Sequence, residues 1–524
     1  MAVATKSSYL VRAASLAEVE TAGCLVIPLQ GHTVVLFAQN GKVYALDNRC
    51  PHMGFPLQRG TVQDGILTCH WHHARFDIAS GGTFDPWADD VRVFPTEIRD
   101  GEVWVDLTPP ADPNAHHRGR LREGLERDIS LVTGKAVIAL LSGGENPAVP
   151  FQIALEFGVR NRSAGWGAGL TILTCIMNLL PRLDAEDHPR ALYHGVSAVA
   201  RDCAGNAPRF SLRPLPSLTK GWESLKQWFR QFVEVRDAEG AERCIVSAVR
   251  AGADHRLMAD MLFTAATDHR YIQIGHVADF TNKALEALDV AGWDYAEPVL
   301  ASLASSLASA DRMEESNQWR HPVDLVAVLE NAFERLPEAA AMGQRRTTQR
   351  PAQRTSCDSL LADALLAALQ EGVAAEHLAG AVVHAASLRI AQFQTTNEFG
   401  DWDTAHHTFT FSNAIHQALR RASSVELLRG VFDAAMSVYL DRFLNVPPAR
   451  LPDPNDVAEH PEELLHEIPG LLNRQHQVDE AGRIAGRYLY SNGNPDRLMA
   501  VLGHCLLRED RDFHTIQAIE ASFR

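Results

Sequence analysis

The 524-residue sequence lacks several signatures that would point to secretory proteins or to nucleotide-dependent enzymes. None of its eight cysteines forms a CxxC pair, which argues against a disulfide framework and favours a reducing compartment. Two glycine-rich stretches, residues 142–144 and 165–169, lack the GxGxxG spacing and a preceding strand, so we expect no dinucleotide site. The first twenty residues are charged and hold no apolar signal core. We therefore predict a cytoplasmic protein.

Positive charge and long apolar runs are also scarce. There are 49 Lys and Arg against 65 Asp and Glu, a net charge of −16, which disfavours nucleic acids and anionic membranes as partners. Residues 163–181 carry no charge, but three glycines, Asn178 and Pro181 dilute their apolar character. Such a stretch is more typical of a buried helix than of a membrane-spanning one, so we predict no membrane span.

The length exceeds what one compact core accommodates, and the composition changes along the chain. Residues 21–107 contain short β-branched or aromatic runs separated by Asn-Gly and Asp-Gly turn signals, as in a small antiparallel β domain. The expected strands cover residues 24–28, 33–38, 43–46 and 103–107. A polar, proline-bearing stretch follows them. We predict a β domain over residues 1–108 and a linker over 109–124.

Beyond the linker, Ala- and Leu-rich segments with apolar spacings of three and four predict helices. We divide them into a first half over residues 125–340, an Arg-bearing loop over 341–357 and a second half over 358–524. Residues 276–288 and 407–419 share five of 13 positions, as stacked α-hairpins or chance in Ala-rich sequence would produce. The predicted fold is multidomain, with a small antiparallel all-β domain followed by a large, mainly α-helical domain.

One motif in the β domain is highly specific. Cys50-Pro-His52 is followed, after sixteen intervening residues, by Cys69-His-Trp-His72. Each loop supplies one thiolate and one imidazole, so two facing loops can hold two sulfide-bridged irons, one on the thiolates and one on the imidazoles. Replacing two thiolates by imidazoles raises the reduction potential of such a cluster. A zinc site is the alternative, although zinc fingers favour a CxxC pair with an HxxxH pair.

Through these residues, positions 8–108 resemble the Rieske 2Fe-2S domain of soluble Rieske ferredoxins and ring-hydroxylating oxygenases. The resemblance implies a 2Fe-2S cluster with Cys50 and Cys69 on the inner iron and His52 and His72 on the outer, solvent-facing iron. His73 stands where Gly or Ser is usual, and a register that uses His73 in place of His72 remains an alternative. The extra cysteines of the quinol-oxidising branch are absent, so the sequence resembles the oxygenase-associated branch.

A cluster of this kind needs an electron acceptor, so a second centre is expected in the helical region. Ring-hydroxylating oxygenases carry a DxxHxxxxH iron motif, but residues 184–194 have both gaps one residue too long. Helical spacing does place Asp403 beside His407. We predict a His-lined site that binds a second, non-heme iron or a substrate, although caps or satisfied core residues are the alternative for any single histidine. The candidates are His188, His194, His255, His276, His377 and His407.

Residues 271–279 and 406–413 faintly resemble the His-rich helical questin oxidase-like family, which is associated with oxygen insertion into aromatic polyketides. This resemblance implies an oxygenase with a small, aromatic substrate. The leading hypothesis is a Rieske-dependent oxidoreductase or monooxygenase, whose cluster is reduced by an electron-donating reductase and serves the His-lined site. The alternative is a Rieske electron carrier or redox sensor fused to a non-catalytic helical scaffold.

Overall fold

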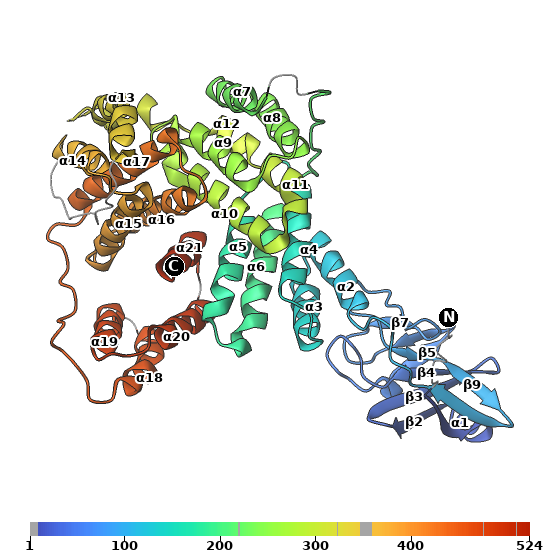
Figure 1. Ribbon diagram of the computed structural model, residues 1–524. Helices are drawn as coiled ribbons and strands as arrows, with labels where there is room; N and C mark the ends of the chain where they lie inside the picture. The colour runs from blue at the N-terminus through green and yellow to red at the C-terminus, as the bar shows by residue number, and fades with distance from the viewer. Residues whose placement is uncertain (1–8, 218–220, 322, 346–358, 475, 510) are drawn as a thin grey trace. The chain divides into compact units, whose positions relative to one another are not determined.

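The computed structural model describes residues 9–217, 221–321, 323–345, 359–474, 476–509 and 511–524 (Figure 1). The chain separates into two compact units, Met1–Asn146 and Pro147–Arg524. The first unit contains small antiparallel sheets followed by two helices, and the described part of the second is built from helices and loops. The predicted order of a small all-β domain followed by a large α-helical one is confirmed.

Three antiparallel sheets form the β part of the first unit. Their strand orders are β1-β10-β9, β2-β3-β4-β8 and β5-β6-β7. A short helix, α1 (Leu16–Ala22), follows β1 and is capped by the Ser15 side chain. The strands are β1 Leu10–Ser15, β2 Cys24–Leu29, β3 His32–Gln39, β4 Lys42–Asp47, β5 Thr61–Gln63, β6 Ile66–Thr68, β7 Arg75–Asp77, β8 Val93–Phe94, β9 Thr96–Arg99 and β10 Glu102–Asp106.

The hairpin turns follow the turn signals of the sequence. Asn40-Gly41 joins β3 to β4, Asp64-Gly65 joins β5 to β6, and Asp100-Gly101 joins β9 to β10, and both residues of each turn have positive φ. Turns with two positive φ values match the right-handed twist of the flanking strands, and Asn, Asp and Gly tolerate them best. The expected strands accordingly coincide with β2, β3, β4 and β10 within one or two residues.

Two helices, α2 (Ala115–Glu126) and α3 (Ser130–Ser142), complete the first unit. The sequence predicted a linker over residues 109–124, whereas α2 begins at Ala115 and the first unit runs to Asn146. Although this stretch is polar in composition, α2 has a buried face that includes Arg120, Leu121 and Leu125. A guanidinium can be buried where carbonyl and carboxylate oxygens accept its N–H groups, and Arg120 has such partners.

The second unit contains the remaining α-helices. They are α4 Ala148–Arg160, α5 Ala168–Leu179, α6 His188–Cys203, α7 Trp222–Glu234, α8 Ala238–Arg250, α9 His255–Thr267, α10 His276–Ala291, α11 Ala296–Ala301, α12 Ala304–Ser309, α13 Leu325–Gln344, α14 Ser359–Gln370, α15 Ala375–Ala391, α16 Phe399–Arg421, α17 Val425–Asp441, α18 Pro461–Leu472, α19 Val478–Tyr490, α20 Pro495–Arg508 and α21 Phe513–Ser522. The loop expected over residues 341–357 lies largely outside the described residues, and α13 extends to Gln344.

The uncharged stretch at residues 163–181 forms the helix α5, most of which is buried. Within the described ranges, no helix combines the length and the apolar composition that crossing a membrane requires. The two similar segments, residues 276–288 and 407–419, lie in α10 and α16, which pack against each other. Their shared histidines therefore come from neighbouring helices.

Candidate functional site

The two Cys/His loops of the first unit have the same backbone geometry. In the first loop, the amide of Cys50 donates to the carbonyl of Phe55 (2.8 Å), and the carbonyl of Cys50 accepts from the amide of Gly54 (2.7 Å). The second loop repeats this pattern from Cys69, with distances of 2.8 and 2.9 Å. A tight turn after each cysteine brings the histidine two or three residues later back toward the thiol, as the spacing of the motif predicts.

The four side chains of the motif converge. Cys50 and Cys69 are 3% and 1% exposed, and the rings of His52 and His72 lie 4.8 Å apart at nearly right angles. Burial raises the pKa of the Cys50 thiol to about 11, with the neighbouring Cys69 adding to the shift. Nδ1 of His52 is buried and has no hydrogen-bond partner in the protein. Two sequestered thiols and an imidazole nitrogen without a partner fit a metal cluster, whose binding displaces the thiol protons.

The structure also distinguishes His72 from its neighbour. Both residues are exposed, but the ring of His72 faces that of His52, whereas His73 adopts a φ of 64° at the end of the turn. Two aromatic rings lie against the ligand histidines: Trp87 is 4.7 Å from His52, and Trp71 is 4.6 Å from His72. The imidazole pair is therefore formed by His52 and His72, and His72 is the more exposed of the two.

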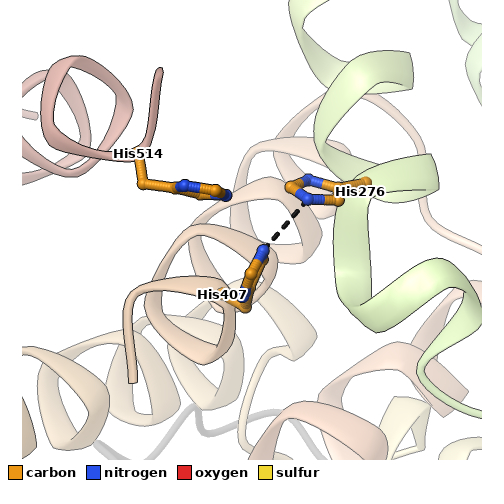
Figure 2. A group of neighbouring side chains, drawn as sticks. All are labelled: His276, His407 and His514. Carbon is orange, nitrogen blue, oxygen red and sulfur yellow. Dashed lines mark hydrogen bonds between the residues drawn. The ribbon is translucent and has the colours of Figure 1, made fainter. Parts of the chain in front are cut away.

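A second convergence of imidazoles lies in the helical unit. His276, His407 and His514 come from α10, α16 and α21, and their rings point toward one another (Figure 2). One ligand nitrogen from each lies within 4.8 Å of the others, and the Nε2 atoms of His276 and His407 are 3.0 Å apart. Nitrogens bound to one metal at about 2.1 Å are separated by roughly 3.0–3.4 Å at octahedral or tetrahedral angles. The spacing of this group, the three-histidine site, suits a metal ion.

Asp403 lies behind two of these imidazoles. Its carboxylate oxygens are 3.7 Å from Nδ1 of His407 and 3.3 Å from Nδ1 of His514. A carboxylate at Nδ1 favours the tautomer whose Nε2 lone pair is free, and metal-binding histidines commonly have such a partner. Nε2 of His514 is buried without a hydrogen-bond partner. The negative charge of Asp403 therefore lies beside the Nδ1 atoms of both imidazoles.

The three histidines occupy different kinds of position in their helices. His276 is the first residue of α10 and follows a strained segment in which Tyr271, Gln273 and Ile274 have φ values of 42°, 48° and 49°. A β-branched residue such as Ile274 rarely adopts positive φ, and such strain concentrates at functional sites. His407 lies one helical turn after Asp403 in α16, and His514 lies in the first turn of α21, whose N-cap is Asp512.

Burial keeps His276 and His407 uncharged. Burial, together with the nearby His407 and His514, lowers the pKa of His276 to about 3. Burial also lowers the pKa of His407 to about 4, against the opposing effect of Asp403. Neutral imidazole is the form that binds a metal, so these two histidines need not release a proton for binding near neutral pH.

A buried charge network holds α21 against α10 beside the three-histidine site. Lys283 of α10 donates to Glu520 of α21 (2.5 Å) and to Glu286 (2.9 Å). Arg524, just beyond α21, pairs with Glu286 (2.6 Å) and Glu520 (2.7 Å). Asn178 of α5 donates to both glutamates, which explains a polar residue within that apolar helix. Two cations thus balance two anions, as burial of charge requires.

Comparison with known proteins identifies the first unit. Residues 9–95 match the family model of the Rieske [2Fe-2S] domain. The ferredoxin component of the p-cumate 2,3-dioxygenase system of Pseudomonas putida is 32% identical over 79 residues, which cover 15% of this chain and 67% of that protein. The chain belongs to the Rieske [2Fe-2S] domain family. The Rieske domain implies a 2Fe-2S cluster and supports a role in electron transfer.

Other relatives share only this domain. The ferredoxin component of the naphthalene 1,2-dioxygenase system of Pseudomonas putida is 25% identical over 99 residues, which cover 19% of this chain and 95% of that protein. Apoptosis-inducing factor 3 of Homo sapiens is 38% identical over 79 residues, and the chain spans only 13% of its length. Among solved structures, the Sphingomonas yanoikuyae B1 ferredoxin is 26% identical with a TM-score of 0.18, covering 19% of this chain and 98% of that one.

The helical unit has no family match, so the fainter resemblance to the questin oxidase-like family gains no support from that comparison. Its site rests on geometry alone. Among the predicted histidines, the structure brings together His276 and His407. In the described part of the chain, the other four belong to no such group: His188 and His255 begin α6 and α9 behind the aspartates Asp187 and Asp254, His194 lies farther along α6, and His377 is exposed on α15.

The sequence patterns did not point to His514 of α21 or to its contact with Asp403. The pair of Asp403 and His407 was expected from its i,i+4 spacing, but His514 lies more than a hundred residues away in the sequence and carries no local signal. The nearby Asp512 is a helix cap, which by itself indicates only the start of a helix. Only the packing of α21 shows that His514 completes the site.

Proposed function

We propose that this protein is a Rieske-dependent oxidoreductase of the oxygenase type, in which the Rieske domain supplies electrons to a metal held by His276, His407 and His514. The convergence of three imidazoles in front of the Asp403 carboxylate carries this proposal. Imidazole sites suit zinc, copper, iron and nickel, but zinc has no redox chemistry and would make no use of electrons. Among the remaining metals we assign non-heme iron, the metal that ring-hydroxylating oxygenases carry together with a Rieske cluster, and this iron would supply dioxygen activation when bound.

The surroundings of the three-histidine site fit a small aromatic substrate. Phe280 and Phe513 lie 5.5 and 5.6 Å from the ring of His276 and form an apolar side of the site. The side chains of His514 and Asp403 retain 21% and 31% exposure, so this side of the site lies nearest to solvent. Aromatic walls bind flat apolar molecules by burial and ring contacts, while the histidines hold the metal.

An external, electron-donating reductase is the partner that this function requires. Several similar proteins are named as ferredoxin components of dioxygenase systems, and one belongs to an alkene monooxygenase system of Xanthobacter autotrophicus. In this chain, His52 and His72 present the edge of the cluster site nearest to solvent. The reducing environment favoured by its unpaired cysteines agrees with a cytoplasmic location.

Metal analysis of the purified full chain tests the proposal. Wild-type protein is expected to contain iron clearly above the two ions per cluster. His407→Ala should lower the content to about two while keeping the cluster absorption, and Cys50→Ser should remove the cluster and leave the additional iron. Oxygen uptake that depends on substrate, reductase and His407 would then establish the oxygenase activity.

The rival function is an electron carrier or redox sensor with a non-catalytic helical scaffold. Iron at two per chain in wild-type protein, all of it lost in Cys50→Ser, would contradict the oxygenase proposal and support this rival. Zinc in place of the additional iron would also contradict the proposal. His384→Ala, at an exposed position on α15, is the control for surface effects and should leave the metal content unchanged.

A further inference from the structure

A lysine outside the matched family region contacts the first ligand loop of the cluster site. Nζ of Lys135, on α3, donates a hydrogen bond to the carbonyl oxygen of Pro51 (2.7 Å) and another to that of His52. Lys135 is partly buried. The family match ends at residue 95, so the helix that carries this lysine is an addition to the Rieske domain.

The preceding helix, α2, is anchored to the loop of residues 86–89, on the other side of His52. Arg120 of α2 donates to the carbonyls of Pro86 and Ala88 and lies 3.0 Å from the carboxylate of Asp89. His116 pairs with that carboxylate at 2.7 Å. The intervening Trp87 packs its ring against His52. The hairpin of α2 and α3 therefore holds both the backbone and the ring contact of a predicted cluster ligand.

Asp89, His116 and His117 lie close enough together to suggest a second cation site. The guanidinium of Arg120 already neutralises Asp89, however, and repels a further cation. This group is better explained as the anchor of the hairpin. It fixes α2 and α3, and so fixes the position of the Lys135 charge.

The position of Lys135 has an electrostatic consequence. Reduction adds one negative charge to a 2Fe-2S cluster, and a cation held nearby in a partly buried site stabilises the reduced form. Two hydrogen bonds to carbonyls keep the ammonium beside the ligand loop rather than in solvent, where its effect would be screened. In these hydrogen bonds the carbonyl oxygens, which are the negative ends of the carbonyl dipoles, point toward the ammonium group of Lys135.

We propose that Lys135 raises the reduction potential of the cluster, so that the added α2–α3 hairpin tunes the Rieske domain. Lys135 is a positioning residue that acts through the His52 loop and through its charge. This role depends on the Rieske cluster and not on the three-histidine site. It therefore stands or falls separately from the proposed oxygenase function.

The test compares the midpoint potential of the cluster in the full-length, cluster-loaded chain. Lys135→Gln keeps a hydrogen-bond donor but removes the charge, and Lys135→Arg keeps both. Lys42→Gln removes an exposed lysine from β4 of the same unit and serves as the matched control. We expect the potential to shift to a more negative value in Lys135→Gln, and to stay near the wild-type value in Lys135→Arg and Lys42→Gln.

Iron content and the electron paramagnetic resonance signal of the reduced protein provide the second readout. Both are expected to remain at wild-type level in every variant. An unchanged potential in Lys135→Gln would overturn the proposal, as would an equal shift in Lys42→Gln. Loss of iron from Lys135→Gln or Lys135→Arg would also overturn it, since it would show that Lys135 maintains the loop rather than adjusting the potential.

Discussion

Asp403 contacts two of the proposed ligands of the three-histidine site. In our proposal it does not bind the metal itself. It lies 3.7 Å from His407 on its own helix and 3.3 Å from His514 on α21. Outer carboxylates of this kind set the tautomer and the orientation of ligand histidines. The same carboxylate therefore contacts His407, four residues away on the same helix, and His514, which only folding brings near.

We predict that Asp403→Asn weakens metal binding at the three-histidine site by roughly 10- to 100-fold. The amide still fills the space but removes the negative charge that lies 3.7 Å from Nδ1 of His407 and 3.3 Å from Nδ1 of His514. Titration of metal-depleted protein with Fe²⁺ or Co²⁺ gives the affinity. Asp401→Asn, two residues earlier on α16 and therefore on a different side of the helix, should bind as wild type. Equal affinity in the two variants would contradict the assigned role.

Asp441 is a buried carboxyl remote in the sequence from the ligands. It is 3% exposed, one of its oxygens has no hydrogen-bond partner, and burial raises its pKa to about 7. The folded protein thus keeps a proton that the unfolded chain releases above pH 4. The contribution of this group to the free energy of unfolding therefore falls as the pH rises from about 4 to 7 and is constant above 7.

We predict that Asp441→Asn has a higher melting temperature than wild type at pH 8 and a weaker decline between pH 5 and 8. The amide cannot ionise, so it avoids a cost on the order of 4 kcal/mol that follows from the raised pKa. Thermal unfolding at several pH values gives the two profiles. Asp294→Asn, at an exposed position, is the control and should keep the wild-type profile. Parallel profiles for Asp441→Asn and wild type would contradict the prediction.

At the scale of elements, α10 and α21 meet along a row of paired side chains. His276 faces His514 near the start of both helices, Lys283 pairs with Glu520 farther along, and Glu286 pairs with Arg524 at the end. The helices therefore run side by side in the same direction with one register. That register brings His514 to His276 and His407, so the buried charges position a proposed ligand.

We predict that Lys283→Met destabilises the helical unit by about 3–5 kcal/mol, because it leaves two buried glutamates with one cation, Arg524, in place of two. The double variant Lys283→Met/Glu520→Gln removes one charge of each sign and should be less destabilised than the sum of the single variants. Denaturant unfolding measures these energies. Metal affinity should fall in the single variants and recover in part in the double variant. Additive effects on stability would contradict the coupling.

At the scale of the whole molecule, the Rieske domain and the helical unit have separate cores. The ligand cysteines pack within a cluster of buried residues of the first unit that includes Leu57, Leu67 and Phe76. A distinct apolar cluster around Ile468, Ile484 and Tyr488 lies in the helical unit. Units with their own cores unfold independently to the extent that few interactions link them.

We predict that Cys50→Ser removes the visible absorption of the cluster but shifts the helical thermal transition by less than about 2 °C. The helical unit contains most of the helices, so far-ultraviolet circular dichroism reports mainly on its unfolding. His407→Ala, which lies in that unit, should leave the cluster absorption unchanged and serves as the reciprocal control. A large fall of the helical transition in Cys50→Ser would contradict independence.

The sequence alone determined the features that depend on neighbouring residues. The CxH and CxxH spacings, the Asn-Gly and Asp-Gly turns and the i,i+4 pair of Asp403 and His407 all act over a few residues, where chain geometry limits the possible structures. These were sufficient to predict the β domain, its Rieske motif and two of the three converging histidines.

Tertiary structure decided what depends on contacts between distant segments. His514 joins His276 and His407 only because α21 packs against α5 and α16 and pairs its side chains with those of α10, and Lys135 reaches the His52 loop only because α3 folds back onto the β domain. Side chains far apart in the sequence meet where burial of apolar faces and pairing of buried charges select one packing among many. No local pattern encodes that selection, so the third member of the three-histidine site and the lysine beside the Cys/His loop become visible only in the folded chain.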